Sequence, residues 1–412
     1  MHRKGVRAIA IGAVGALLAG ALAGGASAST HRGGGAGGGK KTEILIGALG
    51  PFFDASTGTK SDEWPAAVKA RVKAANKAKE LGPDVTLKVF ECDTGLNPND
   101  TEQCARDAID QGVVASVGFN GTTGTNLLPI LEGAGIPAIG SVPVSPAEVT
   151  SPVSFPLTSG VPGAFEALPI ALGEKGATKQ SLVLTDLGAA TAAAILFVND
   201  SVERQGYTLG SPVQVAPDQT DFAPIVATAT ADDPEGINVF IIGEPAATFI
   251  QQLRQGGYEG VLSSGSPFLT ESVLDALGDN ANGIQVPSLL RWQKSKGGKQ
   301  YIKEMKKYAK GEAITDLAAN YWLSTWVTID LLKQIIDDGG TPDAASLLAA
   351  AGQLDGYSTQ GMTPPITTTA APQVDSPLPL ERLYNPTVFM FTIKKGKLVE
   401  TGKEFLDPFQ KQ

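Results

Sequence analysis

The sequence predicts an α/β fold with two doubly wound parallel-sheet lobes, joined by a hinge that the chain crosses several times. Three observations lead to this prediction. Short apolar runs alternate with segments of helical length, the alternation occurs in two long series, and a group of helices followed by a single hairpin completes the chain. Strands that alternate with helices form parallel sheets with helices on both faces. Two series therefore predict two lobes.

The first series begins with the apolar strand Ile44-Leu45-Ile46, and the following segment carries Val68, Val72 and Ala75 at helical spacing. The elements predicted after this strand are a helix over 61–79, a strand over 85–90, a helix over 100–111, a strand over 113–117, a helix over 126–132 and a strand over 137–139. These four β-α units form the first lobe.

The second series begins near Val161 and repeats the same unit. Its predicted helices cover 164–172, 189–204, 222–230, 246–254 and 270–277, and its predicted strands cover 181–185, 212–215, 238–242 and 260–263. This series forms the second lobe.

The remaining chain is expected to complete both lobes. Helices are predicted over 299–310, 317–337 and 344–351, and a hairpin over 387–393 and 397–400. We expect hinge crossings near Phe155-Pro156, near Val286-Pro287 and within 360–367. The first lobe then comprises residues 43–155 plus 288–359, and the second comprises residues 156–287 plus 360–412.

The composition argues against several classes of function. The chain has 412 residues with 33 Lys+Arg against 42 Asp+Glu, a formal net charge of −9, whereas nucleic-acid-binding proteins carry a basic excess. Its two histidines, His2 and His31, both precede the predicted fold, which excludes Ser-His-Asp and Cys-His catalysis and His-ligated metal sites there. We expect no enzymatic activity, no metal, no cofactor and no nucleic-acid partner.

Residues 1–28 are predicted to be a secretory signal peptide. A basic head precedes an apolar run over 8–22 and a small-residue cleavage site, Ala26-Ser27-Ala28. A membrane anchor is the alternative, but the run is shorter than the roughly 20 residues that a spanning helix needs. Residues 29–42 are glycine-rich and are expected to form a flexible linker. The protein is therefore expected in the periplasm or at the extracellular face of the cell membrane.

Cys92 and Cys104 are the only two cysteines of the chain. In an exported protein such a pair is more often a disulfide than a redox site, and two free thiols are the alternative. A disulfide would join the end of one strand to the following helix.

The glycine-rich loop over 118–125 (GFNGTTGT) is the first candidate for ligand binding. It would present backbone N–H groups and hydroxyls at a helix N-terminus, just beyond a parallel strand, where anions and small ligands bind. An ordinary turn with threonine caps is the alternative. The loop matches neither the dinucleotide pattern nor the phosphate loop, which argues against ATP and NAD. Its candidate residues are Asn120, Thr122 and Thr123.

Other strand ends are expected to face the same cleft. The fourth strand leads to Ser141 and Val142, and strands of the second lobe lead to Asp186 and Glu244, which are alternatively helix caps. The turn after the first strand adds three candidates for apolar walls, although such residues are more often part of a core. They are Phe52, Phe53 and Trp64.

Taken together, these features resemble type I periplasmic binding proteins, and most closely the branched-chain amino acid receptors of ABC importers. The features concerned are the signal peptide, the linker, the two lobes, the 118–125 loop, residues 135–141 (GIPAIGS), and Asp221-Phe222 before a strand that ends in Gly243. The resemblance covers about residues 43–400.

The resemblance implies an exported receptor, expected to be a monomer, that closes two lobes over a small molecule and presents the closed form to a membrane ABC permease. It assigns Thr122, Thr123 and Ser141 to the carboxylate of an amino acid ligand. The expected ligand is an amino acid or a related carboxylate or amide. The family's ammonium-binding residues do not carry over, because Ala189-Ala190 and residues 265–268 (GSPF) stand at their positions. A ligand-sensing receptor subunit of a signalling system is the alternative function.

Overall fold

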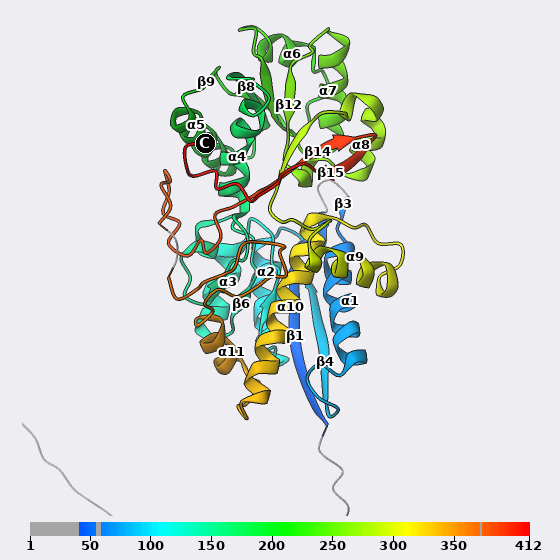
Figure 1. Cartoon of the computed structure of the whole chain (residues 1–412), viewed down its shortest axis with the longest axis vertical. Coiled ribbons are helices and arrows are strands. Elements are labelled where there is room, and N and C mark those ends of the chain that lie inside the picture. The colour runs from blue at the N-terminus through cyan, green and yellow to red at the C-terminus, as the bar shows by residue number, and fades with distance from the viewer. Residues whose placement is uncertain (1–40, 55–58, 371–372) are drawn as a thin grey trace, which may run out of the picture. The chain divides into compact units, whose positions relative to one another are not determined.

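The computed structural model describes residues 41–54, 59–370 and 373–412. Its first main sheet is entirely parallel (Figure 1). The strand order is β4-β1-β5-β6-β7. These strands are β1 (Thr42–Gly50), β4 (Val85–Asp93), β5 (Ser116–Val117), β6 (Ala138–Ile139) and β7 (Ser154–Phe155). The connecting helices are α1 (Glu63–Ala78), α2 (Pro98–Asp110) and α3 (Gly124–Gly133).

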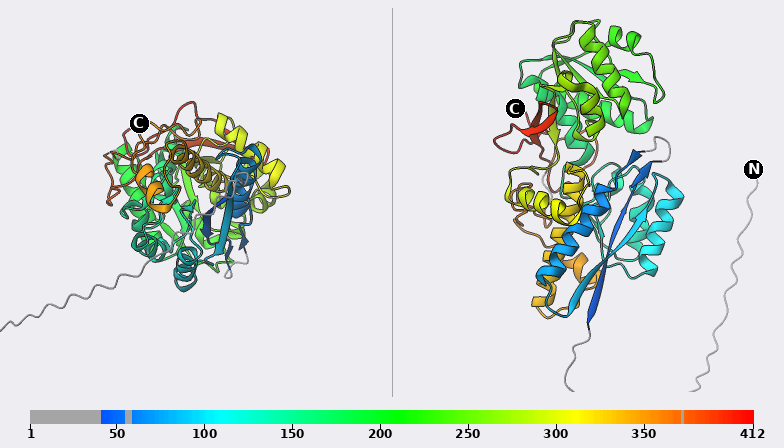
Figure 2. Two further views of the ribbon diagram at one scale, coloured as in Figure 1. Left: turned by 90° about the horizontal axis from the view of Figure 1, so that it is seen from below. Right: turned by 90° about the vertical axis from the view of Figure 1, so that its right-hand side faces the viewer.

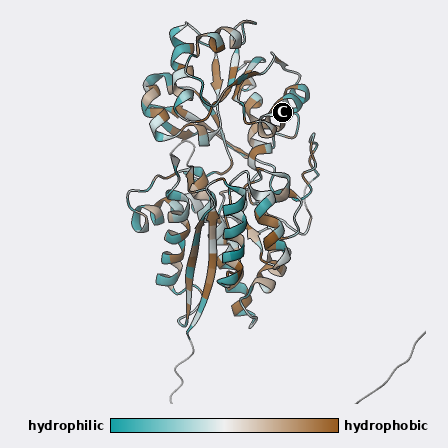
Figure 3. Cartoon of the chain, turned by 180° about the vertical axis from the view of Figure 1, so that it is seen from behind, coloured by the Kyte–Doolittle hydropathy of each residue, from teal (hydrophilic) through white to brown (hydrophobic). Residues whose placement is uncertain are grey.

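The side chains of β1 show why helices cover both faces of this sheet. Successive side chains of a strand point to opposite faces. Ile44, Ile46 and Ala48 belong to the core cluster that includes α1, whereas Leu49 belongs to the cluster of α2 and α3. Figure 2 shows helices on both sides of the blue and cyan strands, and Figure 3 shows hydrophobic colour along the strands. The doubly wound arrangement predicted from the sequence is confirmed.

The second main sheet has the order β10-β8-β11-β12-β13-β14-β15, with β9 beside β8. Its strands are β8 (Lys179–Thr185), β9 (Thr208–Leu209), β10 (Val213–Val215), β11 (Gly236–Phe240), β12 (Val261–Ser263), β13 (Gln285–Ser288), β14 (Phe389–Lys394) and β15 (Lys397–Glu400). In this sheet β14 pairs antiparallel with both β13 and β15, and the β14–β15 pair is the predicted terminal hairpin. The helices are α4 (Gly160–Gly173), α5 (Ala189–Gln205), α6 (Ala223–Ala229), α7 (Glu244–Gln255) and α8 (Glu271–Leu277).

Three further helices follow β13, and the first two connections between the sheets lie where the sequence predicts them. The chain passes from β7 to α4, and later from β13 to α9 (Lys296–Tyr308). The helices α10 (Asp316–Asp337) and α11 (Ala344–Ala351) then follow, and α10 packs against α1, β5 and β6 of the first sheet.

The third connection, predicted within 360–367, belongs to the segment that leads from α11 to β14. Tyr357 and Ile366 form an antiparallel bridge, and Thr368 Oγ1 donates to the carbonyl of Ala351 at 2.6 Å. Residues 357–368 therefore fold back toward α11, and the chain enters the second sheet only at Phe389. The exact lobe limits stay a prediction, because strand order alone does not assign the loops.

Short elements were the hardest to predict. Four sets of strands were not predicted: the antiparallel pair β2 (Phe53–Asp54) and β3 (Thr59–Lys60), the two-residue strand β7, the strand β9 and the strand β13. The predicted signal peptide and most of the linker lie outside the described residues. No helix among residues 41–54, 59–370 and 373–412 is both long and apolar enough to cross a membrane.

Candidate functional site

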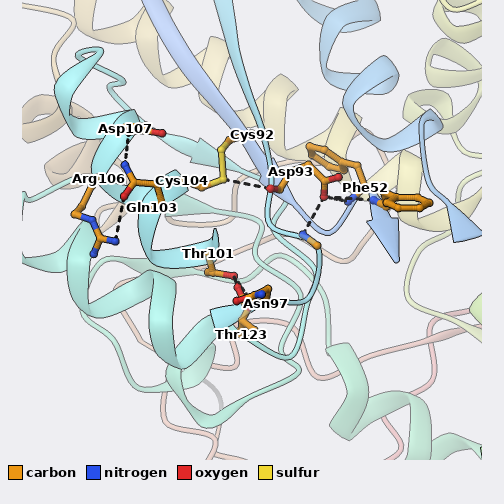
Figure 4. Close-up of a disulfide and its surroundings, with 12 residues drawn as sticks. Phe52, Cys92, Asp93, Asn97, Thr101, Gln103, Cys104, Arg106, Asp107 and Thr123 are labelled. Atoms are coloured by element: carbon orange, nitrogen blue, oxygen red, sulfur yellow. Dashed lines mark hydrogen bonds between the residues drawn. A yellow bond between two sulfur atoms is a disulfide. The ribbon is translucent and has the colours of Figure 1, made fainter. Parts of the chain in front are cut away.

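The turn after β1 is held by the carboxylate of Asp93, at the end of β4. Asp93 Oδ1 accepts hydrogen bonds from the backbone N–H groups of Phe52 at 2.9 Å, Phe53 at 3.3 Å and Gly95 at 3.0 Å (Figure 4). Phe53 is 41% exposed, whereas Phe52 is buried. Phe53 is therefore the predicted wall residue of this turn that a ligand can reach in this structure.

The predicted disulfide lies beside this turn and is confirmed. Cys92 and Cys104 are bonded, with their Cα atoms 5.7 Å apart. The bond joins the end of β4 to α2 (Figure 4). It constrains the residue next to Asp93, and so supports the turn that carries Phe53.

Tyr321 of α10 packs beneath the ends of β1 and β5, and no sequence pattern singled it out. Trp64 stacks on its ring with the centroids 5.7 Å apart, and Phe52 packs edge-on at 6.2 Å. A Cβ atom on Gly50 would lie 2.4 Å from Tyr321 Oη, and one on Gly118 would lie 2.5 Å from Tyr321 Cδ1. Phe52 and Trp64 thus pack on a buried tyrosine, and the two glycines permit its close approach.

The predicted ligand-binding residues of the 118–125 loop differ in their exposure to solvent. Thr122 is exposed and Asn120 is half-buried. Thr123 is buried, and its hydroxyl lies 2.8 Å from the hydroxyl of Thr101 on α2 (Figure 4). The Thr101 hydroxyl is also 2.8 Å from the Asn97 carbonyl, so these groups form a chain inside the lobe. Thr122 is the threonine whose hydroxyl is open to a ligand.

A buried carboxylate stands at the N-terminus of α3. Glu148 Oε2 accepts hydrogen bonds from the backbone N–H and the hydroxyl of Ser145, at 2.8 and 2.7 Å. A Cβ atom on Gly124, the first residue of α3, would lie 1.7 Å from Glu148 Oε1. Burial raises the pKa of the Glu148 carboxyl to about 7. An anion at this helix N-terminus would have Glu148 beside it, and the protonated acid is the form compatible with that anion.

We expect Glu148→Gln to remove part of the pH dependence of stability. An acid whose pKa is raised in the folded state holds its proton to higher pH than in the unfolded chain, so stability is lost as the pH rises from about 4.5 to about 7. The expected loss is on the order of 3 kcal/mol. Urea denaturation of both proteins below and above this window measures it. Glu132→Gln, at an exposed residue of α3, is the control. An equal pH dependence in Glu148→Gln and in the wild type would contradict the assignment.

The end of β6 carries a buried hydroxyl. Ser141 is 1% exposed, and its Oγ has no hydrogen-bond partner among the described residues. The N–H group of Val142 donates to the carbonyl of Phe119 at 2.7 Å, which places this turn beside the 118–125 loop. The Gly140 carbonyl accepts from Asn320 Nδ2 at 2.8 Å. The two loops predicted to bind together are therefore neighbours, and α10 supports them.

The strand ends of the second sheet present apolar as well as acidic side chains. Asp186 is exposed, and its Oδ1 accepts the N–H of Gly188 at 2.9 Å, which agrees with a capping role. Glu244 is the exposed first residue of α7. Leu187 and Ile242, which follow β8 and β11, are 46% and 36% exposed, and the prediction missed both. In the sequence, each is an apolar residue that lies at or just beyond the end of a predicted strand and directly precedes a glycine, and this pattern could have identified them.

Asp316, which the sequence analysis also missed, links the two sheets. It is the first residue of α10 and is buried. It accepts hydrogen bonds from Ser266 Oγ, in the loop after β12, and from Ser288 Oγ, at the end of β13, the latter at 3.1 Å. Burial raises the pKa of this carboxyl. A helix packed on the first sheet is thus tied to two residues of the second.

Comparisons with known proteins agree with the fold. Residues 43–382 match the family described as periplasmic binding protein. A search of curated proteins found no match.

Several solved structures share the fold at low sequence identity. A branched chain amino acid ABC transporter from Thermus thermophilus with bound valine has a TM-score of 0.73 at 14% identity, covering 90% of this chain and 98% of that one. A leucine binding protein from Thermotoga maritima has a TM-score of 0.68 at 18% identity, covering 89% and 99%. A solute binding protein of an ABC transporter from Rhodopseudomonas palustris, in complex with 3,4-dihydroxy benzoic acid, has a TM-score of 0.70 at 19% identity, covering 89% and 98%.

Proposed function

Because the chain belongs to the periplasmic binding protein family, we propose that it is the exported binding protein of an ABC importer. It binds a small molecule with a carboxylate or amide end and an apolar body, closes its lobes over that molecule and delivers it to a membrane permease. The family match supports the binding role.

The observation that carries the proposed ligand class is the contrast between the two sets of strand ends. Thr122, Asn120 and Ser141 offer hydroxyl and amide groups in the first lobe, beside the N-terminus of α3, where hydrogen-bond acceptors and negative charge are favoured. Leu187 and Ile242 expose apolar surface in the second. Small-molecule sites combine a few polar groups with mostly apolar walls.

The ligand's polar end is accordingly assigned to the first lobe. Phe53 supplies an apolar wall beside it, and the neighbouring Phe52 is packed, like Trp64, against Tyr321. Asp186 or Glu244 of the second lobe would meet a positively charged group, if the ligand carries one. A ligand without an ammonium group remains compatible with all of these residues.

A thermal-shift screen of the wild-type protein tests this proposal. Compounds are paired so that each member differs by one group: leucine with 4-methylpentanoate, and benzoate with benzamide. A ligand present at 100 times its dissociation constant stabilises the folded state by about 2.7 kcal/mol. We expect one carboxylate or amide to reach such a shift. If amino acids, carboxylates and amides all left the unfolding temperature unchanged, the proposed ligand class would be wrong.

A further inference from the structure

A hollow of about 470 Å³ lies outside the strand-end site. Its lining includes Gly135 and Pro152, which precede β6 and β7, so it opens at the start of these strands and not at their carboxyl ends. Residues of α11 and three residues that follow it, Thr368, Arg382 and Tyr384, complete it. This volume falls in the range of small-molecule sites, about 300–1,000 Å³.

Arg382 lines this hollow, and none of the described acidic side chains forms an ion pair with it. Its Nε donates to the Ser154 carbonyl at 3.0 Å and its Nη2 to the Pro152 carbonyl at 3.2 Å. Its guanidinium carbon lies 5.0 and 5.3 Å from the ring centroids of Phe155 and Tyr384. Among the side chains that the structure describes, no carboxylate oxygen lies within 4.0 Å of this guanidinium. Its Nη1 makes none of the described hydrogen bonds.

Most of the other arginines of the described fold have a described carboxylate partner, which Arg382 lacks. Arg71, Arg106, Arg204 and Arg291 each pair with a carboxylate. Arg254 has no such partner; its Nη1 donates to the carbonyls of Tyr258 and Gly260, and it does not line the hollow. A partly buried cation with no described carboxylate within ion-pair distance is costly, so the Arg382 site favours an anion.

We propose that this hollow is a second binding site, for a small organic carboxylate with an apolar body. The planar guanidinium matches a carboxylate, and Val153, Leu348 and Ala349 supply apolar walls. The carboxylate of Glu132 also lines the hollow and accepts from Ser151 Oγ at 2.9 Å. Its negative charge repels an ion of higher charge, such as phosphate, more strongly than a singly charged acid. The hollow therefore favours a singly charged acid.

Benzoate is the probe, and benzamide is its neutral counterpart. Titration calorimetry on the full chain is run in the Thr122→Ala, Ser141→Ala background, which weakens the strand-end site. In that background we expect benzoate to bind and benzamide to bind at least ten-fold more weakly. Arg382→Gln should weaken benzoate at least ten-fold, whereas Arg254→Gln, which removes the other unpaired arginine, should leave its affinity unchanged.

A second variant separates loss of binding from loss of folding. Ala349 is an exposed residue of α11, so Ala349→Trp should fill the hollow while Arg382 stays in place, and should also abolish benzoate binding. Crystals soaked in 4-iodobenzoate should show anomalous signal from iodine beside Leu348 in the wild type and none there in either variant. Iodine found only elsewhere, or benzoate affinity unchanged by Arg382→Gln, would overturn the proposal.

Discussion

We expect Gly118→Ala to destabilise the protein by about 2–5 kcal/mol. This cost has two sources: alanine is unfavourable in the left-handed backbone conformation, and its Cβ atom would overpack the contact with Tyr321. Gly118 has φ +74°, and an added Cβ would lie 2.5 Å from Tyr321 Cδ1 and 2.8 Å from Tyr321 Cα. The backbone of α10 would have to move to accept it. Urea denaturation measures the loss, and ligand affinity should fall with it because the 118–125 loop would shift.

Gly135→Ala is the matched control for this substitution. Gly135 has a similar φ of +66°, but an added Cβ would meet nothing within 4 Å. Its cost should be confined to the backbone, about 1–2 kcal/mol. The difference between the two variants then measures the contact between the end of β5 and Tyr321. Equal losses in both variants would show that this contact is not tight.

We expect loss of the Cys92–Cys104 disulfide to cost about 3 kcal/mol, because an open chain regains the entropy of a 12-residue loop on unfolding. The variant with Cys92→Ala and Cys104→Ala should lose this amount, and so should the wild-type protein in reductant. Chemical denaturation with and without reductant provides the measurement. Reductant should not affect the double variant. A wild-type midpoint that reductant leaves unchanged would contradict a stabilising role.

The fold could be predicted from the sequence because its signals are local. The pattern of the 317–337 segment predicts a long helix, which is α10 in the structure. The pattern of the 397–400 segment predicts a strand after a Lys-Gly turn, which is β15. Strand β7 has only two residues, too few to show a period. The Tyr357–Ile366 bridge was not predicted, because it joins residues within a Thr/Pro-rich segment that has no apolar period.

The candidate site was less predictable because its supports come from distant segments. Loop 118–125 and Ser141 were found from their place after strands. Tyr321 lies about 200 positions from the loop that it supports, and nothing in the period of α10 distinguishes it from other buried residues of that helix. Nothing in the sequence distinguishes Glu148 from an ordinary polar residue, because only the fold brings it against Gly124. Contacts of this kind depend on tertiary packing.

The most direct test of the binding account is the affinity of the screened ligand for the variant with Thr122→Ala and Ser141→Ala. We expect affinity at least about ten-fold weaker, the cost of losing hydrogen bonds to a charged group. The unliganded variant should keep its stability, because neither hydroxyl makes a described hydrogen bond. In the control Ser154→Ala, the lost hydroxyl donates to the Glu148 carbonyl at 2.8 Å, so stability should fall by about 1 kcal/mol while affinity stays unchanged. Wild-type affinity in the double variant, measured by titration calorimetry, would contradict a ligand site at these strand ends.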